Sequence, residues 1–158
     1  MAGPYLSTGS FKTRITSVDT TAQEELGIWR WEAGKVLRYV KAGSLIQAFE
    51  PVRLDFTVAG GSPLLLGNQV LPVSASTDVF MGIAEVTMAN LNFGWITVYG
   101  PATARVNTNE IPGAALGPSN AAGASGILAI RNSSHFSAVA VALQTGLSMG
   151  SAVFVTVL

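Results

Sequence analysis

Cysteine is absent from the 158-residue sequence, and histidine occurs once, at position 135. Disulfides and thiol chemistry are therefore excluded, and a zinc site built from cysteine and histidine has too few ligands. No group of aspartates has the spacing of a calcium-binding loop. We expect no metal-binding residue and no cofactor.

Charged residues are also scarce. They make up 11% of the chain, whereas a soluble domain usually has roughly 25%. Nine Lys and Arg balance nine Asp and Glu, so no basic field attracts nucleic acid, and we expect no nucleic-acid partner. A neutral surface with few charges is easier to understand if other protein subunits cover much of it.

Long apolar runs of the kind that enter membranes are missing too. Residues 136–158 carry no charge, but polar residues and glycines between Gln144 and Ser151 interrupt them. This interruption argues against a transmembrane helix. The first residues, MAGPYLSTGSFKTR, contain no apolar run of the signal-peptide type. We therefore expect no membrane partner and synthesis in the cytoplasm.

Catalytic motifs are not found either. His135 follows Ser133 and Ser134, but adjacency in sequence does not make a triad, and no Gly-x-Ser-x-Gly elbow occurs. Gly34-Lys35 lacks the earlier glycine and the hydroxyl residue of a phosphate loop. Nine acids provide no recognisable catalytic pair. The chain is predicted not to be an enzyme, with no catalytic residue.

The sequence does contain many short β-patterned segments between turn residues. They are residues 35–40, 51–58, 70–73, 79–88, 95–99, 126–130, 137–143 and 152–158. Residues 112–126 are predicted to form a loop, and a helical turn is expected only within Thr20–Trp31, where Thr21 and a following glutamate resemble a capping box. This pattern predicts an all-β fold, a compact antiparallel β-barrel or sandwich.

Residues 1–22 are predicted to form an extended N-terminal arm, and residues 23–158 a single β domain. The arm is rich in Ser, Thr and Gly and carries the apolar anchors Tyr5, Leu6, Phe11, Ile15 and Val18. These anchors indicate a segment that is ordered by the surface on which it lies. A frayed terminus is the alternative.

The segment FGWITVYG, residues 93–100, is apolar on both faces. Successive side chains of a strand point to opposite sides, and a half-buried strand normally has one polar face. Here one face carries Phe93, Trp95, Thr97 and Tyr99, and the other carries Ile96 and Val98. We predict a central strand with one face in the core and the other against a partner or a second layer.

Residues 93–104, FGWITVYGPATA, resemble a strand that recurs in small proteins encoded beside tailed-phage capsid genes. The preceding segment 79–84, which enters a strand through a glycine, and the closing segments 137–143 and 150–155 are also similar. The resemblance covers roughly residues 34–158. It implies a head decoration, or cement, protein: a compact β-barrel or sandwich, often trimeric, that clamps neighbouring capsid subunits from outside.

The resemblance implies a virion protein on the outer capsid surface, made in the host cytoplasm. Its expected partners are the major capsid protein and further copies of itself, as a homotrimer. The candidate interface residues are Tyr5, Leu6, Phe11, Ile15, Trp29, Trp31, Trp95 and Tyr99. A core position is the alternative for Trp95.

Two other functions stay open at this point. Exposed Trp and Tyr stack on sugar rings, so the chain could be a carbohydrate- or receptor-binding β module of a virion tail or fibre. The third hypothesis is a small trimeric β nucleotidase, because residues 42–46 superficially resemble its substrate loop. Against it, no acid follows in that loop until Glu50.

Overall fold

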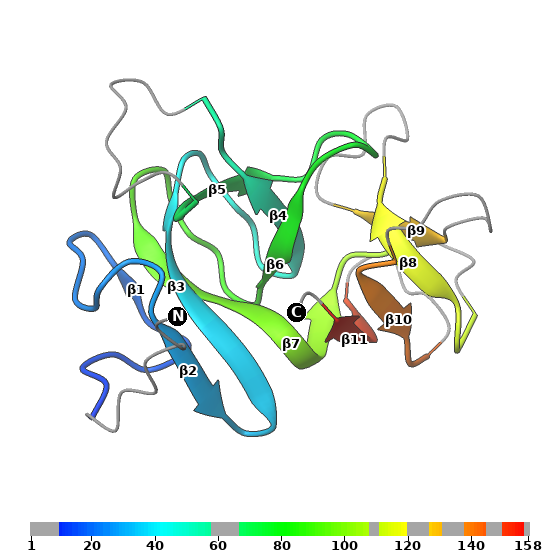
Figure 1. Cartoon of the computed structure of the whole chain (residues 1–158), viewed down its shortest axis with the longest axis horizontal. Coiled ribbons are helices and arrows are strands. Elements are labelled where there is room, and N and C mark those ends of the chain that lie inside the picture. Colours follow the sequence, from blue (N-terminus) through cyan, green and yellow to red (C-terminus); the bar gives the residue numbers. More distant parts are fainter. Residues whose placement is uncertain are drawn as a thin grey trace, which may run out of the picture.

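The computed structural model describes residues 10–57, 67–107, 111–119, 127–130, 138–144 and 150–156. Over these residues the chain forms eleven strands and no helix (Figure 1). The strands are β1 (Val18–Asp19), β2 (Trp29–Glu32), β3 (Lys35–Ala42), β4 (Glu50–Leu54), β5 (Gln69–Pro72), β6 (Phe80–Ala84), β7 (Phe93–Ala104), β8 (Ala115–Pro118), β9 (Leu128–Ile130), β10 (Ala140–Ala142) and β11 (Ser151–Thr156). The all-β prediction is confirmed.

Five strands form a closed barrel. They follow one another in the order β3-β5-β4-β6-β7, and pairing between β3 and β7 closes the ring. Every neighbouring pair is antiparallel except β3 and β5, which run parallel over two residue pairs. The expected compact β-barrel is therefore present, and it occupies the left half of Figure 1.

A tight hairpin joins β2 to the barrel strand β3. Its two loop residues, Ala33 and Gly34, both have positive φ, 52° and 76°. Two-residue hairpins favour this backbone because its twist matches that of the strands. The hairpin fixes the register, in which Trp29 lies opposite Arg38 and Glu32 opposite Lys35.

Strand β7 leaves the barrel and continues into a second sheet. Its second half pairs with β11, and the order then runs β10, β8 and β9. A parallel bridge between Val106 and Leu128 brings β9 back beside the chain that follows β7. This C-terminal sheet lies on the right of Figure 1, so β7 is shared by both halves of the molecule.

Separate clusters of buried apolar side chains lie on the two faces of β7. Ile96 and Val98 belong to a cluster drawn from all five barrel strands, which is the barrel interior. Trp95 belongs to a different cluster with Leu37 and Tyr39 on the outer face. The strand is largely apolar on both sides because each face packs against its own cluster. The sequence predicted one face in the core and the other against a partner or a second layer, and the second layer is what the structure has.

A third cluster joins the barrel to the C-terminal sheet. Its members are Val73, Phe80, Ile83, Ala102, Ala104, Val106, Leu116, Leu128, Ala140, Ala142, Val153 and Val155. In β10 the two alanines face this core, whereas Val141 is half-buried and Leu143 is exposed. The side of the strand that carries Val141 and Leu143 is therefore less covered than the side that carries the alanines. Small side chains are selected where the sheet packs closely.

Three expectations from the sequence are wrong. No helical turn occurs within 20–31, where turns lead into β2, and the predicted loop 112–126 contains the strand β8. The strand predicted over 51–58 ends at Leu54. The Asp55 carboxylate accepts hydrogen bonds from the amide and hydroxyl of Thr57, at 2.8 and 2.7 Å. Such a local side-chain bond competes with the sheet ladder and ends the strand.

Gly100 has a φ of +101°, and a Cβ there would lie 2.6 Å from the Gly34 carbonyl oxygen. We expect Gly100→Ala to lower the free energy of unfolding by about 3 kcal/mol or more, because backbone strain and a backbone clash add. Gly113 is the matched control: its φ is +85°, and nothing lies within 4 Å of the added Cβ. Gly113→Ala should cost only about 1 kcal/mol. Equal losses in urea unfolding would contradict the close approach at Gly100.

Candidate interaction surface

The outer face of β7 is covered by the N-terminal segment of the same chain. Phe11, Ile15, Leu26 and Ile28 pack against the cluster that contains Trp95. The Phe11 and Trp95 rings meet edge to face, with centroids 5.4 Å apart. Within the described residues, 10–28 therefore form a cover, which we call the N-terminal cover, over the barrel of their own chain.

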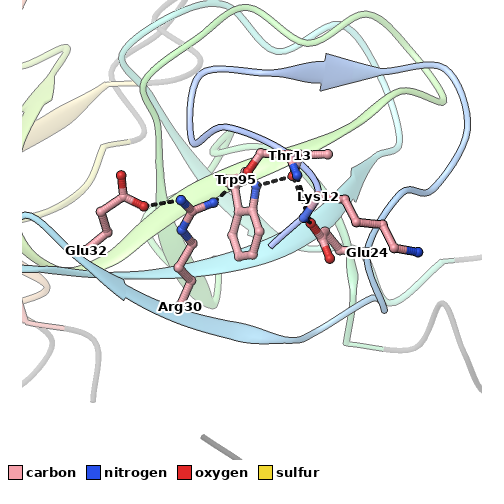
Figure 2. A network of polar contacts seen from close by, with 6 residues as sticks. All are labelled: Lys12, Thr13, Glu24, Arg30, Glu32 and Trp95. Carbon is pink, nitrogen blue, oxygen red and sulfur yellow. Dashed lines mark hydrogen bonds and ion pairs between the residues drawn. The ribbon is translucent and has the colours of Figure 1, made fainter. Parts of the chain in front are cut away.

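A polar network fixes the N-terminal cover in place (Figure 2). The Trp95 indole Nε1–H donates to the Thr13 hydroxyl at 2.9 Å. Glu24 Oε1 accepts hydrogen bonds from the Lys12 and Thr13 amides, at 2.6 and 2.9 Å. Arg30 donates from Nη1 to the Thr13 carbonyl oxygen at 2.6 Å and forms an ion pair with Glu32. The buried indole N–H is thus satisfied from a segment far away in sequence.

Tyr39 forms the second polar anchor of this face. Its hydroxyl donates to Asp19 Oδ2 at 3.2 Å and accepts from the Gln23 amide at 3.3 Å. Burial raises the pKa of Tyr39 to about 12, because the phenolate would lose solvation, and the neighbouring Asp19 charge acts in the same direction. The neutral hydroxyl is the form that holds β1 and the following turn.

The predicted interface residues have different positions in the structure. Trp95 is 1% exposed and lies in the core of its own chain, so the core alternative holds for this residue. Phe11 and Ile15 are half-buried in the N-terminal cover, and Trp29 is half-buried. Tyr99 is half-buried and packs edge to face on Phe154. Tyr5 and Leu6 lie outside the described residues.

Trp31 is the one predicted interface residue, among those described, whose side chain is largely open. It is 62% exposed. Further large apolar side chains on the described surface were not predicted as interface residues: Leu45, Phe56, Val79, Leu91, Ile111, Ile130 and Leu143. Phe56 lies in the segment 51–58 that was predicted to be a strand, two residues beyond the end of β4. Turn positions could have indicated Leu45 and Leu91, since both follow turn residues in the sequence.

Leu45 and Leu91 extend from one end of the barrel. The Leu91 amide donates to the Ala42 carbonyl, and the Ala42 amide donates to the Asn92 carbonyl, so this turn lies beside the end of β3. Leu91 has a φ of +68°, a left-handed backbone that costs a branched, bulky side chain free energy. Leu91 is also 56% exposed, so packing within the chain does not repay this strain. We call Leu45 and Leu91 the barrel-end patch.

A depression of about 350 Å³ adjoins Leu45 and is lined also by Gln47, Phe49 and Arg105. Arg105 Nη1 donates to the Glu50 carboxylate at 3.2 Å, and its Nη2 donates to Gln47 Oε1 at 2.5 Å. Burial raises the pKa of Glu50, whereas the Gln47 amide and Arg105 act to lower it. The guanidinium is therefore engaged in joining the barrel to the chain after β7, rather than presented to a ligand.

No set of three or more His, Cys, Asp or Glu side chains that could hold a metal ion occurs in the described part of the chain. The same residues include no helix of the length and apolarity needed to cross a membrane. What the described surface offers is exposed apolar side chains and an open strand edge.

Comparison with known proteins gave no relative: no protein-family model matches the chain, and no curated protein matches its sequence. The fold defines the class, an all-β barrel protein with an added C-terminal sheet. Any function must therefore be argued from the surface.

Removing the Glu24 side chain should release the N-terminal cover. We expect Glu24→Ala to lower the free energy of unfolding by about 1–3 kcal/mol, because two backbone amides lose their charged acceptor. Glu25→Ala is the matched control, since Glu25 is the exposed neighbour and a surface substitution typically changes stability by about 0.5 kcal/mol or less. Urea unfolding and hydrogen exchange of the Thr13 amide measure both effects. Identical behaviour of the two variants would show that Glu24 does not hold the cover.

Tyr39 should make the fold sensitive to alkali. Above the ordinary pKa of 10.0 the unfolded chain loses the phenol proton, whereas the folded chain keeps it up to a pKa of about 12. The folded state then binds more protons, so the free energy of unfolding falls as pH rises through this window. Tyr39→Phe should show a smaller fall in the free energy of unfolding with rising pH. Tyrosinate absorbance of the two folded proteins should differ by one titration, that of Tyr39, with a pKa of about 12. The same alkaline loss of stability in both proteins would contradict this.

Proposed function

We propose that this chain is a structural virion protein that binds the outer capsid surface and stabilises the head by bridging major capsid protein subunits. The observation that carries the proposal is the set of large apolar side chains exposed on separate elements of a chain with few charges. Single exposed apolar side chains are ordinary on a soluble protein, so the proposal rests on their combination with a charged fraction of only 11%, which favours a surface covered by partners. The resemblance of residues 93–104 to proteins encoded beside capsid genes indicates the partner.

The described charges are largely used inside the molecule. Arg30–Glu32, Lys35–Glu85, Arg53–Asp78 and Arg105–Glu50 are ion pairs within the chain. Arg30–Glu32 lies within β2, and the other three pairs join different strands or loops, so these charges contribute less to a repulsive charged surface. A surface of this kind favours contact with other proteins over free solution.

The N-terminal cover changes how the clamp would work. Residues 1–22 were predicted to form an arm that is ordered by the surface on which it lies, and in this structure Phe11, Ile15 and β1 pack on the barrel of their own chain. The capsid contact is therefore assigned to the barrel-end patch, Leu45 and Leu91. Several such copies on one shell would act together, because simultaneous weak contacts raise avidity by about 10²–10⁴.

Binding to capsid shells tests this function. Purified protein mixed with expanded shells that lack it should co-sediment, saturating at a copy number commensurate with the capsid lattice. Absence of binding by a folded protein would overturn the capsid proposal. Binding on a glycan array would then favour the carbohydrate-binding module of a tail or fibre.

Leu91→Asn tests the barrel-end patch. Asparagine tolerates positive φ better than leucine, so the free energy of unfolding should stay equal or rise. Shell binding should fall at least tenfold, corresponding to about 1.4 kcal/mol. Leu143→Asn is the control, because Leu143 is equally apolar and half-exposed but follows β10 in the C-terminal sheet. If Leu143→Asn lost more shell binding than Leu91→Asn, the capsid contact would have to be assigned to the C-terminal sheet instead.

A further inference from the structure

Strand β2 presents an open edge. The strand order ends at β2 on one side and at β9 on the other. Strand β9 is bridged beyond that end, through Leu128, to Val106. Within the part of the chain that the structure describes, β2 pairs with β3 alone. Figure 1 shows β2 at the outer border of the barrel half.

The register shows which backbone groups face that edge. The Tyr39 amide donates to the Ile28 carbonyl, so the polar groups of Ile28 point toward β3. In antiparallel pairing the direction alternates residue by residue. Arg30 and Glu32 therefore also bond toward β3, and the N–H and C=O groups of Trp29 and Trp31 point toward the open edge.

The side chains at this edge do not protect it. Natural edge strands are usually guarded by short length, by charged side chains (lysine above all), by proline or by a bulge. Strand β2 is short and carries Arg30 and Glu32, but these two side chains pair with each other and Arg30 also donates to the Thr13 carbonyl, while Trp31 is 62% exposed. Tryptophan is among the residues that most often dominate binding energy at protein interfaces.

The charges of β2 are complementary to those of a second β2 strand. Arg30 and Glu32 flank Trp31 on the other face of the strand, where they form an ion pair with each other and Arg30 also donates to the Thr13 carbonyl. If two β2 strands run antiparallel with Trp31 opposite Trp31 of the second copy, Arg30 lies opposite Glu32 of the second copy, and the reverse. That pair occupies the non-hydrogen-bonded position, where facing side chains approach most closely.

We propose that two copies of this chain associate by pairing β2 with β2 across a two-fold axis at Trp31. The two Trp31 residues exchange both backbone hydrogen bonds, and the Arg30–Glu32 ion pair of each copy lies beside that of the other, so that charges of opposite sign alternate across the axis. The contact is isologous: both copies use the same residues, so the assembly is complete with two copies. It therefore gives a dimer where the resemblance implies a trimer. This inference goes beyond the proposed function and does not rest on it, because the dimer forms with or without a capsid.

Sedimentation velocity of the purified chain over a range of concentrations tests the dimer. The wild-type chain should sediment as a dimer, and Trp31→Lys as a monomer. Phe56→Lys is the matched control, because Phe56 is 65% exposed but lies beyond β4, and it should remain dimeric. Glu32→Lys should weaken the dimer at least tenfold, since it places two cations opposite each other. A wild-type monomer, or a trimer that Trp31→Lys leaves intact, would overturn the proposal.

A second variant tests the axis without depending on the tryptophan. The sequence has no cysteine, so Trp31→Cys introduces a single thiol at the proposed two-fold. Facing residues in antiparallel strands are about 4.5–5.5 Å apart at Cα, within the range of a disulfide. With oxidised glutathione as the oxidant, the two thiols should join as a disulfide-linked dimer much faster than those of Phe56→Cys. Equal rates for the two variants would overturn the β2 axis even where the chain is dimeric.

Discussion

The burial of Trp95 on the outside of the barrel is the constraint on which the rest of the structure depends. An indole on the outer face of β7 needs an apolar cover and an acceptor for its N–H, and leaving that group unpaired would cost about 1–3 kcal/mol. Both come from the N-terminal cover, through Phe11 and the Thr13 hydroxyl. Residues 10–28 therefore pack as part of the apolar layer on the outer face of the barrel.

Much of the fold could be predicted from period-two alternation and from apolar runs, because a strand buried on both faces, such as β7, is apolar at most of its positions. The strand predictions were wrong where the end of a strand, or the side chain that faces the core, depends on something other than alternation. Asp55 ends β4 through its bonds to Thr57, and the two alanines of β10 face the core whereas Val141 between them is half-buried. Neither effect has a periodic signal, since one is a local side-chain bond and the other depends on the distance between sheets.

The candidate surface was less predictable than the fold. An aromatic residue in a sequence can be an anchor for a partner or a core residue, and composition does not separate the two. Trp95 is buried by contacts 82 positions away in the chain, whereas Trp31 has no comparable cover among the described residues. Leu91 was missed because its significance lies in its backbone: only the φ of +68° shows that an apolar side chain is held there at a cost.

The barrel-end patch and the β2 edge are far enough apart to be occupied together. Trp31 lies opposite Val36 near the start of β3, whereas Leu45 follows the end of that strand. At about 3.3 Å per residue along a strand, the two surfaces are separated by on the order of 20 Å. A dimer paired at β2 would therefore keep both barrel-end patches open. Two weak contacts per dimer then act jointly, which is how modest apolar patches on a small protein can give durable attachment to a repeating lattice.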